Sequence, residues 1–164
     1  MSEELAFKER AAKVIPGGMY GHQSTWRLPD AFPQFIERGL AGHIWDSDGK
    51  RYIDFMSSYG PIILGHAHPK VEESVAQQLK KGDCFNGPSP VIVELAEKLT
   101  GIVDHADWGI FAKNGTDATS ICVAVARSYS GKNKILVAEG AYHGAAPWCT
   151  PLPTGTTEED KMHL

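Results

Sequence analysis

The sequence predicts an α/β fold with a mostly parallel sheet and flanking helices, preceded by a helix and a small antiparallel meander. The parallel sheet is predicted from residues 108–138, which have the pattern strand, helix, strand with short links. Such a βαβ unit has a right-handed crossover and joins parallel strands. The meander is predicted from three short extended stretches before residue 60, which turn residues separate.

The first part of the chain, residues 1–60, predicts one helix and the three strands of the meander. Residues 3–14 place apolar side chains among Glu, Lys and Arg in an amphipathic pattern, and Pro-Gly-Gly at 16–18 ends this helix. The extended stretches are "PQFIERG", "GHIWDSD" and "KRYIDFM", with "DSDGK" as a turn.

The second part, residues 61–164, predicts the parallel sheet and its helices. Pro69 suits the first turn of a helix, and Val71, Val75 and Leu79 give this helix an apolar stripe. Two strands do not complete a parallel sheet, which needs neighbouring strands and cover on both faces, so we expect the chain to be interrupted. The further elements are expected in this order: a helix over Pro90–Leu99, a strand over 108–113, a helix over 116–130 and a strand over 134–138.

Charge and composition argue against nucleic acid and membrane as partners. The chain has 16 Lys and Arg against 20 Asp and Glu, a net charge of -4, and no basic run. No apolar run approaches the roughly 20 residues of a membrane span. The cysteines Cys84, Cys122 and Cys149 are odd in number and widely spaced, as is typical of reduced thiols. We therefore expect a cytoplasmic protein.

The loop "NGTD", which follows the first strand of the βαβ unit, is a candidate anion site. Ligands of open parallel sheets bind beyond the carboxyl ends of the strands. Gly115 permits close approach to the backbone, and Thr116 offers a hydroxyl and an N–H where a helix begins. The free N–H groups and the dipole of a helix N-terminus attract anions. Alternatively, residues 114–117 only cap the helix, since Thr and Asp are common capping residues.

The loop "EGAYHGAA", which follows the second strand, is the other candidate. Tyr142 offers a flat ring that could stack on an aromatic ligand, and Gly140 and Gly144 leave the backbone room to bend. Taken alone, an aromatic residue beside a histidine is more often packing than function. Adjacent strands would bring both loops to one edge of the sheet, which predicts a ligand with a phosphate and an aromatic ring.

Several motifs occur in order along the chain. They include "SDGKRYIDFMSSYGPIILGHAHPKV", "NGTDAT" and "RSYSGKNKILVAEGAYHG". Together they resemble the class III aminotransferases, which are fold type I enzymes that use pyridoxal 5'-phosphate (PLP). "VIPGG" followed by Ser24-x-x-Arg27 resembles the glutamate-1-semialdehyde 2,1-aminomutase branch and its aminotransferase relatives. The resemblance runs from about residue 10 to residue 150.

The resemblance implies an aspartate aminotransferase-like fold and a homodimer. Residues 1–60 would belong to the small domain, and 61–164 would begin the large PLP-binding domain. The stretch "PTGTTEEDKMHL" corresponds to a mobile loop that gates the active site, where the chain is interrupted. The Schiff-base lysine and the acidic partner of the pyridine nitrogen would lie beyond the match to Leu164. No catalytic residue is therefore assigned within this sequence.

The resemblance also implies the residues of the cofactor site. Gly115 and Thr116 match the residues that hold the phosphate, and Tyr142 matches the aromatic residue that stacks on the pyridine ring. His143 adjoins it and is included in the cofactor site. Asn114 also belongs to the phosphate loop, where the family commonly has Ser.

Three further residues are candidates for the substrate site. Arg27 matches the arginine that receives the substrate carboxylate, a role for which a planar guanidinium is suited. Tyr59 stands where the aminomutases have Trp, which suggests a different side-chain pocket, and Ser24 is a candidate for the same pocket. No metal is expected, because His66 and His68 belong to the family's strand-to-helix junction and no third ligand is nearby.

The activity that the resemblance implies is PLP-dependent transfer of an amino group between an amino acid, or amino ketone, and a keto acid or aldehyde. Intramolecular transfer by an aminomutase, or racemisation, is an alternative that uses the same cofactor. A non-catalytic ligand-binding fragment is an alternative of another class.

Overall fold

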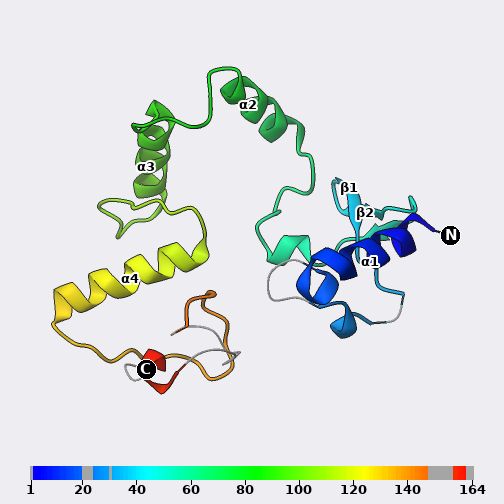
Figure 1. The fold of residues 1–164 in the computed structure, drawn as a ribbon. Coiled ribbons are helices and arrows are strands. Elements are labelled where there is room, and N and C mark those ends of the chain that lie inside the picture. The colour runs from blue at the N-terminus through cyan, green and yellow to red at the C-terminus, as the bar shows by residue number, and fades with distance from the viewer. Residues whose placement is uncertain (1, 20–23, 30, 148–156, 162–164) are drawn as a thin grey trace. The chain divides into compact units, whose positions relative to one another are not determined.

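The structure, a computed structural model, describes residues 2–19, 24–29, 31–147 and 157–161. The chain forms two compact units (Figure 1), an N-terminal unit, Met1–Asn86, and a C-terminal unit, Gly87–Leu164. Among the described residues, no helix has both the length and the apolar character that a membrane span requires.

The N-terminal unit confirms the predicted first helix, the meander and the helix that begins at Pro69. The three strands form one antiparallel sheet in the order β1-β2-β3, and Leu40 pairs with His43 at the β1–β2 turn. The elements are α1 (Glu3–Val14), η1 (Pro16–Gly18), η2 (Thr25–Arg27), β1 (Ile36–Leu40), β2 (His43–Asp46), β3 (Arg51–Ile53), η3 (Ser57–Tyr59) and α2 (Pro69–Leu79).

Two carboxylates hold the first turn of α1 against the meander. One Glu4 oxygen accepts a hydrogen bond from Gln34 N at 2.8 Å, and the other accepts from Ser47 Oγ at 3.1 Å. In return, Asp48 Oδ1 accepts from Glu3 N at 2.7 Å. The bond to Asp48 satisfies a backbone donor that a helix N-terminus otherwise leaves without a partner. Polar contacts therefore fix the position of α1.

A third carboxylate joins β2 to β3. The buried Asp46 accepts from Tyr52 Oη at 2.7 Å and from Lys50 N at 2.8 Å. The hydrogen bond from Tyr52 is the largest cause that holds the pKa of Asp46 below its ordinary value. The same bond, with burial, raises the pKa of Tyr52 to about 12 from its ordinary value of 10.0.

Tyr52→Phe should lower the free energy of unfolding by about 1 kcal/mol near pH 8, since it removes one hydrogen bond. Because the folded-state pKa of Tyr52 is raised, its contribution is fully present below pH 10 and is lost as the pH rises through about 12. The difference between the two proteins should therefore shrink over that range in urea unfolding followed by circular dichroism. Tyr129→Phe, at a ring that is 94% exposed, is the matched control and should change little. A difference that stays constant to pH 12 would contradict the assignment.

The C-terminal unit contains α3 (Pro90–Ile102), α4 (Gly115–Ser130) and α5 (Glu158–Lys161). The first two confirm predicted helices, and α3 runs three residues past the predicted end. Local signals fix the ends of α4: Asn114 caps its N-terminus, and Gly131, with a φ of 67°, ends it in the left-handed conformation.

The predicted parallel sheet is wrong for this structure. Residues 108–113 and 134–138 are not strands, and the sheet within the described residues is the antiparallel meander. A strand needs hydrogen-bonding partners on a neighbouring strand, whereas a helix such as α4 makes its hydrogen bonds within itself. Ile110 is 55% exposed and Leu136 is 99% exposed, so each stretch leaves an apolar side chain without cover.

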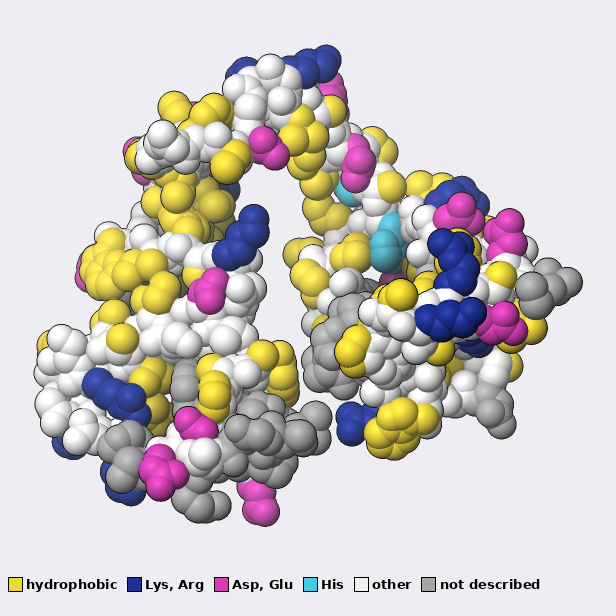
Figure 2. All heavy atoms as spheres, in the orientation of Figure 1, with side chains coloured by type: hydrophobic (Ala, Val, Ile, Leu, Met, Phe, Trp, Pro, Cys, Tyr) yellow, Lys and Arg dark blue, Asp and Glu magenta, His cyan; other side chains and the backbone are white. Residues whose placement is uncertain are grey.

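Apolar side chains are also exposed on the helices of the C-terminal unit. Figure 2 shows them over the surfaces of α3 and α4, where Val93 and Val125 are exposed. Beside α4, an open apolar hollow of about 430 Å³ is lined by residues that include Trp108, Ile121 and Tyr129. The elements of this unit are therefore held more by their own hydrogen bonds than by a common core.

Two expectations fall partly on residues that the structure does not describe. Most of the predicted gating loop lies outside it, apart from α5 and Thr157. Cys84 and Cys122 are free thiols, as expected, whereas Cys149 lies outside the described residues.

Candidate functional site

The "NGTD" loop caps α4 and also presents free donors. Asn114 Oδ1 accepts from Asp117 N at 3.0 Å, and Asn114 Nδ2 donates to Asp117 Oδ2 at 2.9 Å. The capping role therefore holds for these two residues. The backbone N–H groups of Gly115 and Thr116 have no acceptor among the described residues. Two donors at the positive end of the helix thus remain for a ligand.

The space beside these donors is open. A Cβ added to Gly115 would meet no atom within 4 Å. An anion at this place would accept from backbone N–H groups and would interact favourably with the helix dipole. The residues present therefore fit a phosphate group such as that of PLP.

Hydroxyl groups of α4 bring the second candidate loop to the same place. Thr116 Oγ1 accepts from Ala145 N at 3.0 Å, and Thr119 Oγ1 shares its one hydrogen between the carbonyls of His143 and Thr116, each at 3.1 Å. The structure therefore brings Thr116 and the segment 143–145 together, although neither preceding stretch forms a strand. Sequence reasoning missed Thr119, which lies three residues after Thr116 and hence on the same face of the helix.

The side chains of the second loop differ in exposure. Tyr142 is 57% exposed, so much of its ring surface is open. His143 Nε2 is buried without a partner among the described residues. A buried polar atom without a hydrogen bond is uncommon and is expected to find its partner in a ligand or water. A ligand with a flat ring and polar substituents fits this combination.

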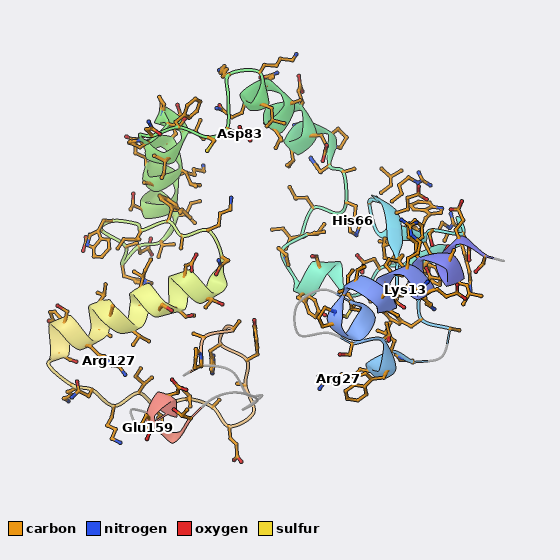
Figure 3. The ribbon with its side chains drawn as sticks, viewed as in Figure 1. Lys13, Arg27, His66, Asp83, Arg127 and Glu159 are labelled. Carbon is orange, nitrogen blue, oxygen red and sulfur yellow. The ribbon has the colours of Figure 1, made fainter. Side chains whose placement is uncertain are left out.

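The substrate candidates belong to the N-terminal unit. Ser24 precedes η2, and its carbonyl accepts from Arg27 N at 3.0 Å. The Arg27 guanidinium stacks over the Trp26 ring, 4.7 Å from its centroid, and Figure 3 shows Arg27 at the surface of this unit. Stacking restrains the guanidinium but leaves the N–H groups at its edge able to bind a carboxylate.

The third substrate candidate, Tyr59, lies in an unusual turn. Ser57, Ser58 and Tyr59 have φ values of 46°, 53° and 65°, and Gly60 follows with 107°. Each non-glycine residue in the left-handed region costs roughly 1–2 kcal/mol. Such strain persists where surrounding contacts impose it, and it is concentrated at functional sites.

Asp54 supplies such contacts. Its Oδ1 accepts from Met56 N at 2.9 Å and from Ser57 N at 3.0 Å, while its Oδ2 lies 2.6 Å from His66 Nε2. The hydrogen bond with His66 is the largest cause that lowers the pKa of Asp54, and the two backbone donors add to it. Sequence reasoning missed this pair, because residues 12 apart in an irregular segment share no periodic pattern.

A metal site has no support in the described residues. Among them, no three His, Cys, Asp or Glu side chains lie close enough together to hold a metal ion. His66 is engaged by Asp54, and His68 Nδ1 is buried with no described partner.

Comparisons with known proteins agree along nearly the whole chain. Residues 27–163 match the family model described as "Aminotransferase class-III". The chain is 50% identical over 157 residues to an aminopentol aminotransferase of Sphingopyxis macrogoltabida, which is 96% of this chain and 37% of that protein. It is 42% identical over 144 residues to a glutamate-1-semialdehyde 2,1-aminomutase of Bordetella avium (strain 197N), which is 88% of this chain and 34% of that protein.

A solved structure supports the same relationship. The structure is similar to that of the FumI protein of Sphingopyxis sp. MTA144 in its "PLP internal aldimine form", with a TM-score of 0.93 and 49% identity. The match covers 98% of this chain and 39% of that protein, so the chain spans less than half the length of each of these relatives. Together with the family model, these similarities show that the chain belongs to the class III aminotransferases, a family of PLP-dependent enzymes.

Proposed function

We propose that this protein transfers an amino group between an amino acid, or amino ketone, and a keto acid or aldehyde, with PLP as cofactor. The observation that carries the proposal is the meeting of two loops at the start of α4. The N–H groups of Gly115 and Thr116, which have no acceptor among the described residues, lie there, and hydroxyls of α4 hold the segment 143–145. The greater identity to an aminotransferase, 50%, than to an aminomutase, 42%, favours transfer between two substrates.

The residues of the C-terminal unit would hold the cofactor as follows. The N–H groups of Gly115 and Thr116 donate to the phosphate. Thr116 Oγ1 already accepts from Ala145 N, so its own hydrogen is left to donate to a phosphate oxygen. Tyr142 stacks on the pyridine ring, and His143 Nε2 gains a polar partner. When bound, PLP supplies the electron sink that this chemistry requires.

The residues of the N-terminal unit would hold the substrate. Arg27 binds the carboxylate through its planar edge, while Tyr59 and Ser24 line the pocket for the rest of the molecule. Tyr59 replaces the Trp of the aminomutases, which supports a side-chain pocket of different shape. Family membership also supports a homodimer in the cytoplasm, with residues 1–60 in the small domain and 61–164 at the beginning of the cofactor-binding domain.

The test is an absorption spectrum of the purified full-length protein, before and after borohydride, with an assay of amino-group transfer. We expect a visible PLP band that borohydride abolishes, and a new amine formed from an added keto acid. Pyridoxal without the phosphate should bind at least tenfold more weakly than PLP. A product that retains the amino group of the single substrate would favour the aminomutase or racemase. Failure to bind PLP would leave the non-catalytic alternative.

Arg27→Ala should raise the KM for carboxylate substrates about 10- to 100-fold, because a hydrogen bond to a charged group contributes about 1.5–3 kcal/mol. The KM for simple amines should change little. Arg38→Ala is the matched control, since Arg38 also stacks on a tryptophan, 3.6 Å from the Trp45 ring centroid, but lies in the meander. Equal effects of Arg27→Ala on both classes of substrate would refute the role.

A further inference from the structure

We propose that Asp54 and His66 are positioning residues that impose the left-handed turn at 57–60 and so fix the place of Tyr59. The inference rests on the proposed function, in which Tyr59 lines the substrate pocket. Its evidence is a chain of contacts that begins at the sheet and ends at the turn.

His66 is anchored independently of the turn. Its backbone pairs with Ala41 in both directions, N to O, each at 2.9 Å. Its ring lies so close to β1 that a Cβ added to Gly39 would be 2.6 Å from His66 Cγ. The backbone bridge and the ring contact together hold Nε2 in one place. Figure 3 shows His66 in the segment between η3 and α2.

Asp54 connects this anchor to the turn. Its side chain is 8% exposed, and its backbone N donates to the Gly42 carbonyl at 3.0 Å. One carboxylate oxygen meets His66 Nε2, and the other accepts from the N–H groups of Met56 and Ser57. Asp54 and His66 also line one open hollow of about 370 Å³, together with Ser57 and Ile62. The single carboxylate therefore transmits the position of His66 to the beginning of the turn.

The turn depends on that support. Met56 is right-handed, whereas Ser57, Ser58 and Tyr59 are left-handed without being glycine. Among the described residues, two short backbone bonds close the turn, from Tyr59 N to Met56 O at 2.8 Å and from Gly60 N to Ser57 O at 2.9 Å, and a longer bond runs from Ile62 N to Ser57 O at 3.4 Å. A reversal of φ at these residues would turn the Tyr59 side chain in another direction. Loss of the support should therefore change which substrates fit, and should leave the cofactor site of the C-terminal unit as it is.

The experiment compares variants of the full-length PLP-bound protein. His66→Phe keeps a ring against Gly39 but loses the nitrogen, and Asp54→Ala removes both acceptors. Asp54→Asn is the conservative variant, because its amide oxygen still accepts from the turn and its NH₂ donates to an unprotonated Nε2. His68→Phe is the matched control, since no described bond joins His68 to the turn.

Amide exchange of 56–60 is the first readout, and it requires no activity. We expect exchange at least tenfold faster in His66→Phe and Asp54→Ala, and within threefold of the parent in Asp54→Asn and His68→Phe. The second readout is the KM for amino donors with a large and a small side chain. In His66→Phe and Asp54→Ala, the KM for the large donor should rise at least tenfold. The KM for the small donor and the Kd for PLP should stay within twofold of the parent values.

Unchanged exchange in both His66→Phe and Asp54→Ala would overturn the inference and leave the proposed function intact. Faster exchange with an equal rise in both KM values would overturn the positioning role and make the pair merely structural. Tyr59→Ala separates the two proposals. If it leaves both KM values unchanged while the exchange results hold, the pocket assignment fails and the support of the turn stands.

Discussion

Gly39→Ala should lower the free energy of unfolding of the N-terminal unit by about 1–3 kcal/mol, the usual effect of overpacking a filled space. The added Cβ would lie 2.6 Å from both Cγ and Nδ1 of His66 and 2.9 Å from its Cβ. These atoms are near the backbone of His66, which is itself bonded to Ala41, so a rotation of the ring alone does not relieve the contact. The strand or the bridge must move, and the hydrogen bond to Asp54 should weaken with it.

Gly42→Ala is the matched control, because a Cβ there would meet no atom within 4 Å. The measurement is amide exchange of β1 and β2 in the full-length protein, which reports the free energy of local opening. The control should stay within about 0.5 kcal/mol of the parent, as is usual for surface substitutions. Equal protection of the two variants would show that the space behind Gly39 is larger than the structure describes.

Gly115→Ala should weaken PLP binding at least tenfold while leaving α4 intact. The new methyl group would lie next to the Gly115 N–H and would crowd the approach of a phosphate to the two free donors. In the absence of a ligand, no described atom beyond the adjoining residues and the helix backbone lies within 4 Å to oppose it. Helix stability should even rise, by up to about 1 kcal/mol, because Ala favours a helix more than Gly does.

Gly101→Ala provides the comparison for this second prediction. Gly101 lies in α3 and also has open space around its Cβ position. Both variants should therefore gain helix stability, but only Gly115→Ala should lose affinity in a titration with PLP. An unchanged Kd in Gly115→Ala would move the phosphate away from the start of α4.

The parts of the fold that could be predicted are those with local causes. The limits of α4 follow from the cap at Asn114 and the left-handed Gly131, and α1 follows from its amphipathic pattern and the Pro-Gly-Gly after it. The meander could be predicted because turn residues such as those of "DSDGK" separate its strands. The parallel sheet could not be predicted, because an apolar run such as 108–113 becomes a strand only when a neighbouring strand accepts its hydrogen bonds.

The candidate site likewise has features that the sequence predicts and features that it does not. The donors of Gly115 and Thr116 follow from their place at a helix start, which a sequence shows. The support of Tyr59 cannot be seen in the sequence. The left-handed turn contains no glycine at 57–59, and Asp54, which precedes the turn, imposes it through hydrogen bonds. The bond from Thr119 to His143 spans 24 residues and likewise has no local signal.

The hydroxyl of Thr116 has a consequence for how the two loops communicate. It accepts from Ala145 N, a residue 29 positions further along the chain. A hydroxyl that donates its hydrogen to an anion becomes more electron-rich, so it accepts more strongly on its other side. Arrival of a phosphate would therefore tighten the hold on Ala145 with no movement of α4. The Thr116 hydroxyl oxygen would thus couple the two loops. Binding of a phosphate at the start of α4 would restrain the segment that follows Tyr142.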